Sequence, residues 1–211
     1  MGHSDQALSD DFIPVTRCFV AFELDEPSRA YLAGYVVPVH AALKTRQRWP
    51  MRLVRPENWH LTVLFFEELS AAEREEVWKF IEPTATRGGW GELAFDWRGL
   101  ALWPNPRRPS LVALEAEPYA LAQSWPIAPL LNRPPFSQGE TRHFSPFRPH
   151  ITVMRFDPRW RKTIAEDWAA VTQDLEPIDS SRLRFVELSL VLSTLTPEES
   201  VYVRERRVRL G

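Results

Sequence analysis

The sequence has few of the residues that build disulfide-bonded, metal-binding or nucleotide-binding folds. It contains one cysteine, Cys18, among 211 residues, so no intrachain disulfide can form and zinc sites that need two or four cysteines are excluded. A single cysteine is typical of reducing compartments, and we expect a cytoplasmic protein. The eight glycines form no Gly-rich phosphate-binding loop. No stretch reaches the ~18 consecutive apolar residues of a membrane span, so no membrane association is expected.

What remains is typical of a globular chain. The net charge is −2, 44% of the residues are hydrophobic and 12% are aromatic, which suits a protein with a sizeable core. Residues 1–15 are polar and acidic, and we interpret them as a disordered or partly engineered tail. Residues 16–211 are then expected to form a single domain, and nothing in the sequence requires more than a monomer.

Apolar periodicity predicts a mixture of strands and helices. A helix is predicted from Pro27 to about residue 46, a second begins at the capping box formed by Ser70 and Glu73, and a third covers residues 160–175. Residues 118–131 are expected to be partly helical, and residues 132–148 to form a Pro-rich loop. Strands are predicted over residues 17–24, 59–66, 95–103, 110–115, 151–156, 185–195 and 201–210. The order lacks a steady βαβ alternation, which favours an α+β fold with antiparallel sheets.

One short motif occurs twice, as His60-Leu-Thr-Val63 and His150-Ile-Thr-Val153. Because side chains alternate between the two faces of a strand, each histidine shares a face with the threonine two residues later. A lone strand histidine is more often a structural residue held by its neighbours. Two histidines from similar strands, however, supply one neutral imidazole that accepts a proton and one protonated imidazole that donates a proton. His60, Thr62, His150 and Thr152 are therefore the candidate catalytic residues, with the hydroxyls as donors to phosphate oxygens.

Positive charge is concentrated around both motifs. Residues 44–60 hold five basic side chains and one acidic side chain, and residues 133–162 hold seven basic and two acidic side chains. The rest of the chain holds 14 basic and 25 acidic side chains. Arginines that only solvate loops would not need to adjoin both motifs. The distribution therefore predicts an anionic ligand. The basic residues near the end, Arg204, Arg206, Arg207 and Arg209, are interpreted as protection of an edge strand.

The sequence resembles the 2H phosphoesterase superfamily, and within it the RNA 2′,3′-cyclic phosphodiesterases, also called 2′-5′ RNA ligases. The resemblance covers about residues 17–210. It rests on the paired His-x-Thr motifs, the opening run Cys18-Phe-Val-Ala-Phe-Glu-Leu24, the lead-in Arg55-Pro-Glu-Asn-Trp-His60, and residues 146–155 around the second motif. It implies a bilobal fold with two pseudo-symmetric antiparallel sheets, flanked by helices, around a central cleft.

The resemblance also implies an activity. That activity is metal-independent hydrolysis of 2′,3′-cyclic phosphates on RNA ends or small cyclic nucleotides to 2′-phosphomonoesters, possible in reverse as 2′-5′ ligation. His60 would be the general acid and His150 the general base, with Thr62 and Thr152 on the non-bridging oxygens. No cofactor or metal is implied, and no cluster of carboxylates and histidines suited to two metal ions lies near either motif.

Three further residues are candidate substrate contacts. The resemblance assigns Arg155 to the substrate, yet strict alternation places it opposite His150, so it could reach a phosphate only around the strand end or past a β-bulge. Phe66 and Phe156 share parity with the histidines and could stack on a base. Three tryptophans are weaker candidates for stacking, because most aromatics of the chain must lie in the core: Trp59, Trp97 and Trp103.

Other functions remain open from the sequence. One alternative is a non-catalytic nucleotide- or RNA-binding module that keeps the cleft without turnover, and another is an interaction domain with no nucleotide affinity. A third is a phosphodiesterase for 2′-5′ oligonucleotides or cyclic ADP-ribose phosphate. Intact histidines and threonines in both motifs favour the enzyme, because binding alone needs no matched acid and base.

Overall fold

The computed structural model describes most of the chain, and the longest stretch that it leaves undescribed is residues 118–147. The predicted tail at residues 1–15, the partly helical segment 118–131 and nearly all of the Pro-rich loop lie outside the described residues. The described ranges are 16–46, 51–66, 69–87, 93, 95–117, 148–156, 161–195 and 200–211.

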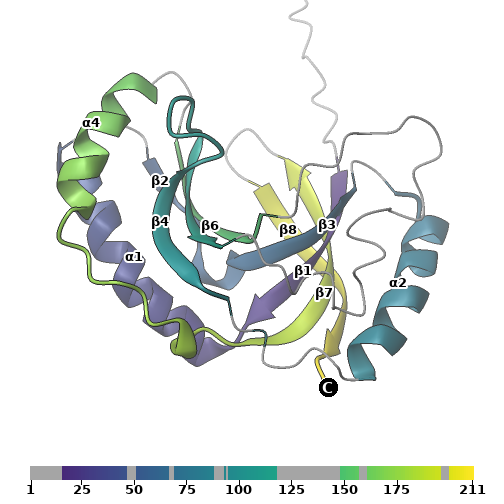
Figure 1. The fold of residues 1–211 in the computed structure, drawn as a ribbon. Helices are drawn as coiled ribbons and strands as arrows, with labels where there is room; N and C mark the ends of the chain where they lie inside the picture. Colours follow the sequence, from purple (N-terminus) through teal and green to yellow (C-terminus); the bar gives the residue numbers. More distant parts are fainter. Residues whose placement is uncertain are drawn as a thin grey trace, which may run out of the picture.

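The described helices are α1 (Glu26–Arg46), α2 (Ala71–Thr86) and α4 (Arg161–Thr172). At the start of α1 the Asp25 carboxylate accepts a 2.8 Å hydrogen bond from the backbone N–H of Ser28, which satisfies one of the free amides of the first turn. The predicted capping box of α2 is confirmed. Helices α1 and α4 pack together on one side of the molecule, and α2 lies beside β8 on the opposite side (Figure 1). None of the described helices is long and apolar enough to cross a membrane.

The strands form a large antiparallel sheet in the order β4-β5-β6-β3-β1-β7-β8, with β2 added to the free part of β6. The predicted α+β antiparallel architecture is therefore confirmed, and β4 and β5 form an antiparallel hairpin. The strand bounds are β1 Thr16–Leu24, β2 Met51–Leu53, β3 His60–Phe66, β4 Trp97–Trp103, β5 Leu111–Ala116, β6 His150–Phe156, β7 Phe185–Leu195 and β8 Ser200–Arg209. Short 3₁₀ turns cover Pro56–Asn58 and Ser180–Arg182.

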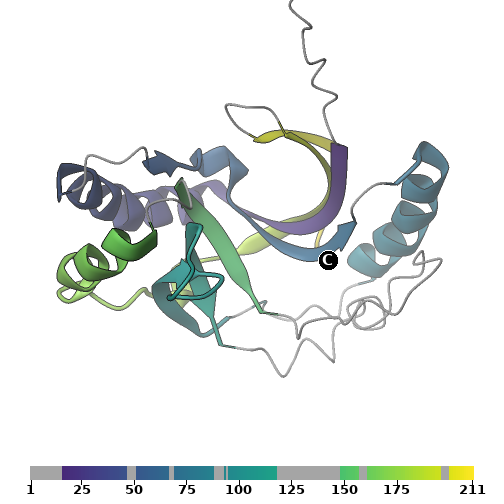
Figure 2. The same cartoon turned by 90° about the horizontal axis from the view of Figure 1, so that it is seen from above.

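The two halves of the sheet meet at a narrow joint between β3 and β6. In the described part of the chain, strands β3 and β6 pair only through Leu61 and Ile151, whereas β1 pairs with β3 and β5 pairs with β6 over most of their lengths. The two sheets expected from the resemblance are thus two halves of one curved sheet, as the view from above shows (Figure 2). The residue before each joint residue is a motif histidine, so the joint brings His60 and His150 to the same region.

Each motif strand contains a β-bulge at the same place. On β3, Thr62 pairs with Ala21 and Leu64 with Val20, which leaves Val63 as an extra residue. On β6 the corresponding extra residue is Val153. An extra residue shifts the alternation of all later side chains by one. On both strands, the side chains after the extra residue therefore point to the face opposite to the one that strict alternation would give them.

The apolar face of the sheet and the helices enclose the core. Trp59, Phe22 and Phe95 are among its largest fully buried side chains, and α1 contributes Leu32 and Val36. Burying an aliphatic or aromatic side chain of this size contributes roughly 1.5–3 kcal/mol. Because Trp59, Leu61 and Ile151 are all fully buried, the backbone that carries both histidines rests directly on this core.

Candidate active site

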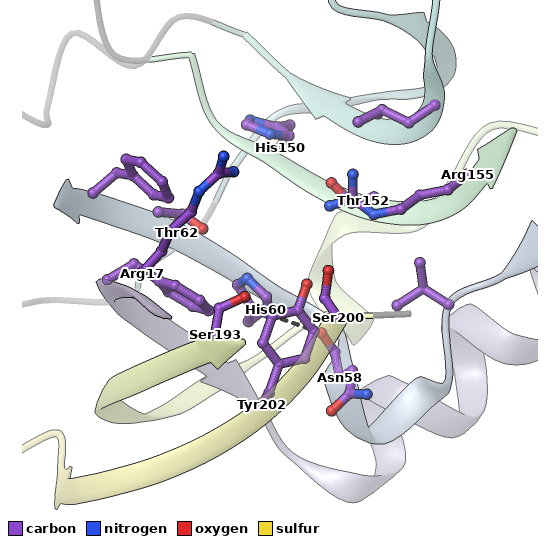
Figure 3. A pocket seen from close by; sticks show the side chains of 14 residues that line it. Arg17, Asn58, His60, Thr62, His150, Thr152, Arg155, Ser193, Ser200 and Tyr202 are labelled. Carbon is purple, nitrogen blue, oxygen red and sulfur yellow. Dashed lines mark hydrogen bonds between the residues drawn. The ribbon is translucent and has the colours of Figure 1, made fainter. Parts of the chain in front are cut away.

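A cleft of about 220 Å³ lies between the two halves of the sheet. All four candidate catalytic residues line it, and Figure 3 shows their side chains directed into the space between β3 and β6. The structure therefore brings together two motifs that are ninety residues apart in the sequence. The described residues that line it are Arg17, Phe19, Val54, Asn58, His60, Thr62, Phe65, Leu111, His150, Thr152, Arg155, Ser193, Ser200 and Tyr202.

The His60 ring is held by a backbone carbonyl and an aromatic face. Its Nδ1 lies 2.7 Å from the carbonyl oxygen of Asn58. A carbonyl only accepts hydrogen bonds, so Nδ1 carries a proton and Nε2 is the nitrogen available to a ligand. The ring stacks on Phe19 of β1 with centroids 4.7 Å apart, and Tyr202 meets it edge-on. The imidazole thus has a fixed orientation and tautomer.

His150 is held by the same two kinds of contact, which different residues make. Its Nδ1 lies 2.9 Å from the carbonyl oxygen of Arg148, two residues earlier, just as for His60. Its ring stacks on Trp103 of β4 with centroids 4.3 Å apart. The guanidinium of Arg148 covers the Trp103 ring at 3.8 Å from the centroid. Trp103 therefore supports the histidine and is not free to stack on a base, a contact that only the register of β4, β5 and β6 could show.

Burial lowers the pKa of both histidines. Desolvation is the largest cause in each case, and it brings the pKa of His60 from 6.5 to about 4. The pKa of His150 is also lowered, with the positive charge of Arg148 as a further cause. A neutral imidazole is preferred in both positions because the surroundings penalise the charged form. An anion bound between the rings would shift both pKa values back upward.

An ion pair lies beside each histidine, and sequence reasoning missed both. Glu23 is opposite His60 on β1, and its carboxylate binds the Arg204 guanidinium, with Nε 2.9 Å from Oε1. Glu115 is opposite His150 on β5 and binds Arg148 at 2.8 Å. The side chains of Glu23 and Arg204 are only 5% and 15% exposed. Arg204 is therefore a partly buried partner of the site and not edge protection.

The bulges decide which residues reach the cleft after the motifs. Arg155 lines it, as the resemblance implied, because Val153 is the extra residue that shifts the alternation. The expectation that Phe66 and Phe156 face the cleft is wrong, since both belong to the core and are only 8% and 7% exposed. On β3 the residue five positions after the histidine is Phe65, which lines the cleft and is 53% exposed.

Neutral donors and one further cation complete the walls. Thr62 and Thr152 present hydroxyls beside their histidines, and Ser193, Ser200 and Tyr202 add hydroxyls from β7 and β8 (Figure 3). Arg17 extends from the start of β1 over the Thr62 side of the cleft. Such a lining of hydroxyls and guanidinium groups suits a phosphate. Within the described ranges, no three His, Cys, Asp or Glu residues are grouped so that they could hold a metal ion.

Comparisons with known proteins agree with this geometry. No family model matches the sequence. The chain is 29% identical over 199 residues to the RNA 2′,3′-cyclic phosphodiesterase of Methanothermobacter thermautotrophicus, covering 92% of this chain and 98% of the relative. Among solved structures, TT0787 of Thermus thermophilus superposes with a TM-score of 0.54 at 24% identity, covering 92% of this chain and 97% of that one.

A second solved structure, E. coli LigT complexed with 3′-AMP, superposes with a TM-score of 0.56 at 21% identity and covers 94% of this chain and 99% of LigT. At these identities the structural matches show the fold. The sequence match covers both histidine motifs, which this fold places on either side of one cleft. The chain is thus similar in sequence to an RNA 2′,3′-cyclic phosphodiesterase over nearly its whole length and shares the fold of TT0787 and LigT.

Proposed function

We propose that this protein hydrolyses 2′,3′-cyclic phosphates at RNA ends or on nucleotides to 2′-phosphomonoesters. The observation that carries the proposal is the pair of oriented imidazoles, His60 and His150, whose Nε2 atoms are available in one cleft. The relative from Methanothermobacter, named an RNA 2′,3′-cyclic phosphodiesterase, supports the same chemistry. A binding module would need the hydroxyls and arginines but not two imidazoles with the same tautomer.

The proposed reaction uses one histidine for each proton. A water oxygen attacks phosphorus while Nε2 of the neutral His150 takes the water proton. The bond from phosphorus to the 3′ oxygen breaks as His60, which is protonated on both ring nitrogens when the anion is bound, donates its Nε2 proton to that oxygen. The hydroxyls of Thr62 and Thr152 stabilise the charge on the non-bridging oxygens. The product is a 2′-phosphate with a free 3′ hydroxyl. Loss of a proton from His150 and gain of one by His60 restore the starting state.

We assign the enzyme to the cytoplasm and to a monomeric state. The single cysteine supports a reducing compartment. Cys18 is buried, and burial raises the pKa of its thiol to about 12, so the reactive thiolate is not formed at neutral pH. Size-exclusion chromatography with light scattering measures the molar mass in solution and so tests the proposed monomeric state.

The direct test is the product formed from adenosine 2′,3′-cyclic phosphate. We expect adenosine 2′-phosphate with EDTA present, because His60 and His150 supply both proton transfers without a metal ion. The products are separated by chromatography against the 2′- and 3′-phosphate standards. Formation of the 3′-phosphate would contradict the assigned leaving oxygen. Binding without turnover, with RNA 2′,3′-cyclic ends also unreacted, would favour a nucleotide-binding module.

The pH dependence of kcat/KM is expected to be bell-shaped with its maximum on the acid side of pH 6.5. One histidine must be neutral, so the rate falls as pH drops below the lower pKa. The other must be protonated, so the rate falls as pH rises above the higher pKa. Burial brings the pKa of His60 to about 4 and that of His150 below 6.5. Because kcat/KM reports the free enzyme, a maximum at neutral or alkaline pH would contradict this prediction.

A further inference from the structure

The side chain of Arg148 is held by three partners on the β4–β5 hairpin. One Nη donates to the Glu115 carboxylate at 2.8 Å, and the other donates to the carbonyl oxygen of Pro104 at 3.3 Å. The guanidinium carbon lies 3.8 Å from the centroid of a Trp103 ring. A planar guanidinium can make paired hydrogen bonds and stack on an aromatic ring at once, which the ammonium group of lysine cannot do. The side chain is therefore fixed in place, although 44% of it is exposed.

The main chain of Arg148 contacts the general base of the proposed reaction. Its carbonyl oxygen is the acceptor that lies 2.9 Å from Nδ1 of His150. Because the peptide unit is planar, this carbonyl can turn only if the backbone of Arg148 turns with it. Trp103, which the guanidinium covers, is also the ring on which His150 stacks. Both contacts that orient the imidazole thus depend on where the Arg148 side chain is held.

The ion pair with Arg148 also occupies a carboxylate that faces the imidazole. Glu115 is the cross-strand partner of His150, and its side chain is only 19% exposed. Directly opposite residues have Cβ atoms about 4.5–5.5 Å apart. A carboxylate without another partner at that distance would compete with the Arg148 carbonyl for the N–H of the imidazole. Binding to the guanidinium prevents this competition.

The other half of the sheet contains a comparable arrangement, made by residues of other strands. Arg204 of β8 binds Glu23, the cross-strand partner of His60, and donates to the backbone carbonyl of Glu57. The next carbonyl, that of Asn58, accepts from Nδ1 of His60. In both halves, an arginine bound to the glutamate opposite a histidine also restrains the backbone that accepts the Nδ1 proton. An ion pair as exposed as that of Arg148 contributes little to stability, so its position favours a role in orienting the imidazole.

We propose that Arg148 is a positioning residue for His150, whose side chain holds the carbonyl and the indole that keep Nε2 of the neutral imidazole unprotonated and directed into the cleft. The inference rests on the proposed function, in which this nitrogen takes the proton of the attacking water. It assigns Arg148 no contact with the substrate. An imidazole that exchanged tautomers would carry its proton on Nε2 for part of the time, and in that form it could not act as the base.

The tautomer of His150 can be measured without turnover by NMR of the imidazole nitrogens at about pH 8, where an ordinary histidine is neutral. Loss of signals in His150→Ala assigns them. We expect wild type to carry its proton on Nδ1 and to leave Nε2 unprotonated. In Arg148→Met the two nitrogen shifts should average toward each other, while those of His60 stay unchanged. An unchanged His150 tautomer in this variant would overturn the proposal, whether or not the protein hydrolyses cyclic phosphates.

Hydrolysis of adenosine 2′,3′-cyclic phosphate gives the second readout. In Arg148→Met, kcat should fall by about 10- to 100-fold with KM unchanged, because a small displacement of a reacting group is sufficient for such a loss. Arg148→Lys keeps the charge but not the planar donors, so it should recover little of the rate. Full activity of the lysine variant would show that the charge alone is sufficient. A rise in KM without a fall in kcat would make Arg148 a substrate contact, and either result would overturn the proposal.

The matched control is Arg98→Met. Arg98 of β4 binds Glu117, which follows β5, and the two side chains are 53% and 47% exposed. Arg98 is not among the described residues that line the cleft, so its variant should keep the wild-type tautomer and kcat. An equal loss in both variants, or a loss in Arg148→Met accompanied by a lower thermal midpoint, would show that the whole hairpin is disturbed and would overturn the positioning role. A wild-type protein with the expected tautomer but no turnover would contradict only the proposed function.

Discussion

Replacing either His60 or His150 with alanine is expected to reduce kcat/KM on 2′,3′-cyclic substrates by about 10²- to 10⁴-fold, which is the contribution of one positioned acid or base. The double replacement should lose less than the product of the two single losses, because the two proton transfers belong to one displacement. Rates are measured at the pH optimum of the wild type. Unchanged circular dichroism and thermal midpoint exclude unfolding as the cause.

A substrate with sulfur in place of the 3′ bridging oxygen separates the two roles. A thiolate leaves without a proton from a general acid, so His60→Ala should recover most of its rate on this substrate while His150→Ala should not. The opposite pattern would exchange the acid and the base. If both variants kept more than a tenth of the wild-type activity on the ordinary substrate, the two-histidine mechanism would be wrong.

Replacing Glu23 with leucine is expected to lower the free energy of unfolding by about 3 kcal/mol, because it leaves the charge of Arg204 buried without its partner. Arg204 also donates to the backbone carbonyl of Glu57, next to the residue that orients His60. The double variant Glu23→Leu/Arg204→Met should recover most of the loss, since an apolar pair can replace a buried ion pair. Urea unfolding of the wild type, Glu23→Leu, Arg204→Met and the double variant measures the cycle.

An exposed ion pair between β8 and α2 gives the comparison. Arg206 and Glu75 are 49% and 43% exposed, so Glu75→Leu should change stability by no more than about 1 kcal/mol. An equal effect at Glu23 would show that the pair beside His60 is not energetically distinct. The pKa of His60, followed by NMR, should fall in Glu23→Leu and rise in Arg204→Met, because the carboxylate favours the protonated imidazole and the guanidinium opposes it.

Local patterns were sufficient to predict the main elements and the four motif residues that line the cleft. Alternation along a strand correctly placed His60 with Thr62 and His150 with Thr152 on one face, because those residues precede the bulges. The same rule failed for Phe66 and Phe156, which follow them. A bulge is defined by the pairing of two strands distant in sequence, so nothing within residues 60–66 or 150–156 reveals it.

Long-range partners were beyond sequence reasoning for the same reason. Glu23 could have been noticed as a carboxylate inside an apolar strand, which needs a partner when buried, but Arg204 follows it by 181 residues. The two basic segments adjoin the motifs in the sequence, and the pairing of Arg52 with Arg155 shows where the segments meet in the fold. Which residues of each segment face one another follows only from the register of β2 on β6.

The joint between the two halves of the sheet lies in the core, so core packing sets the distance between the two histidines. Among the described residues, Leu61 and Ile151 are the one pair that links β3 to β6, and each follows its histidine directly. A change of volume at either residue would therefore tilt one half of the sheet against the other and alter the separation of the imidazoles. Selection could adjust the fit between acid, base and phosphate at this point without touching any residue that contacts the substrate.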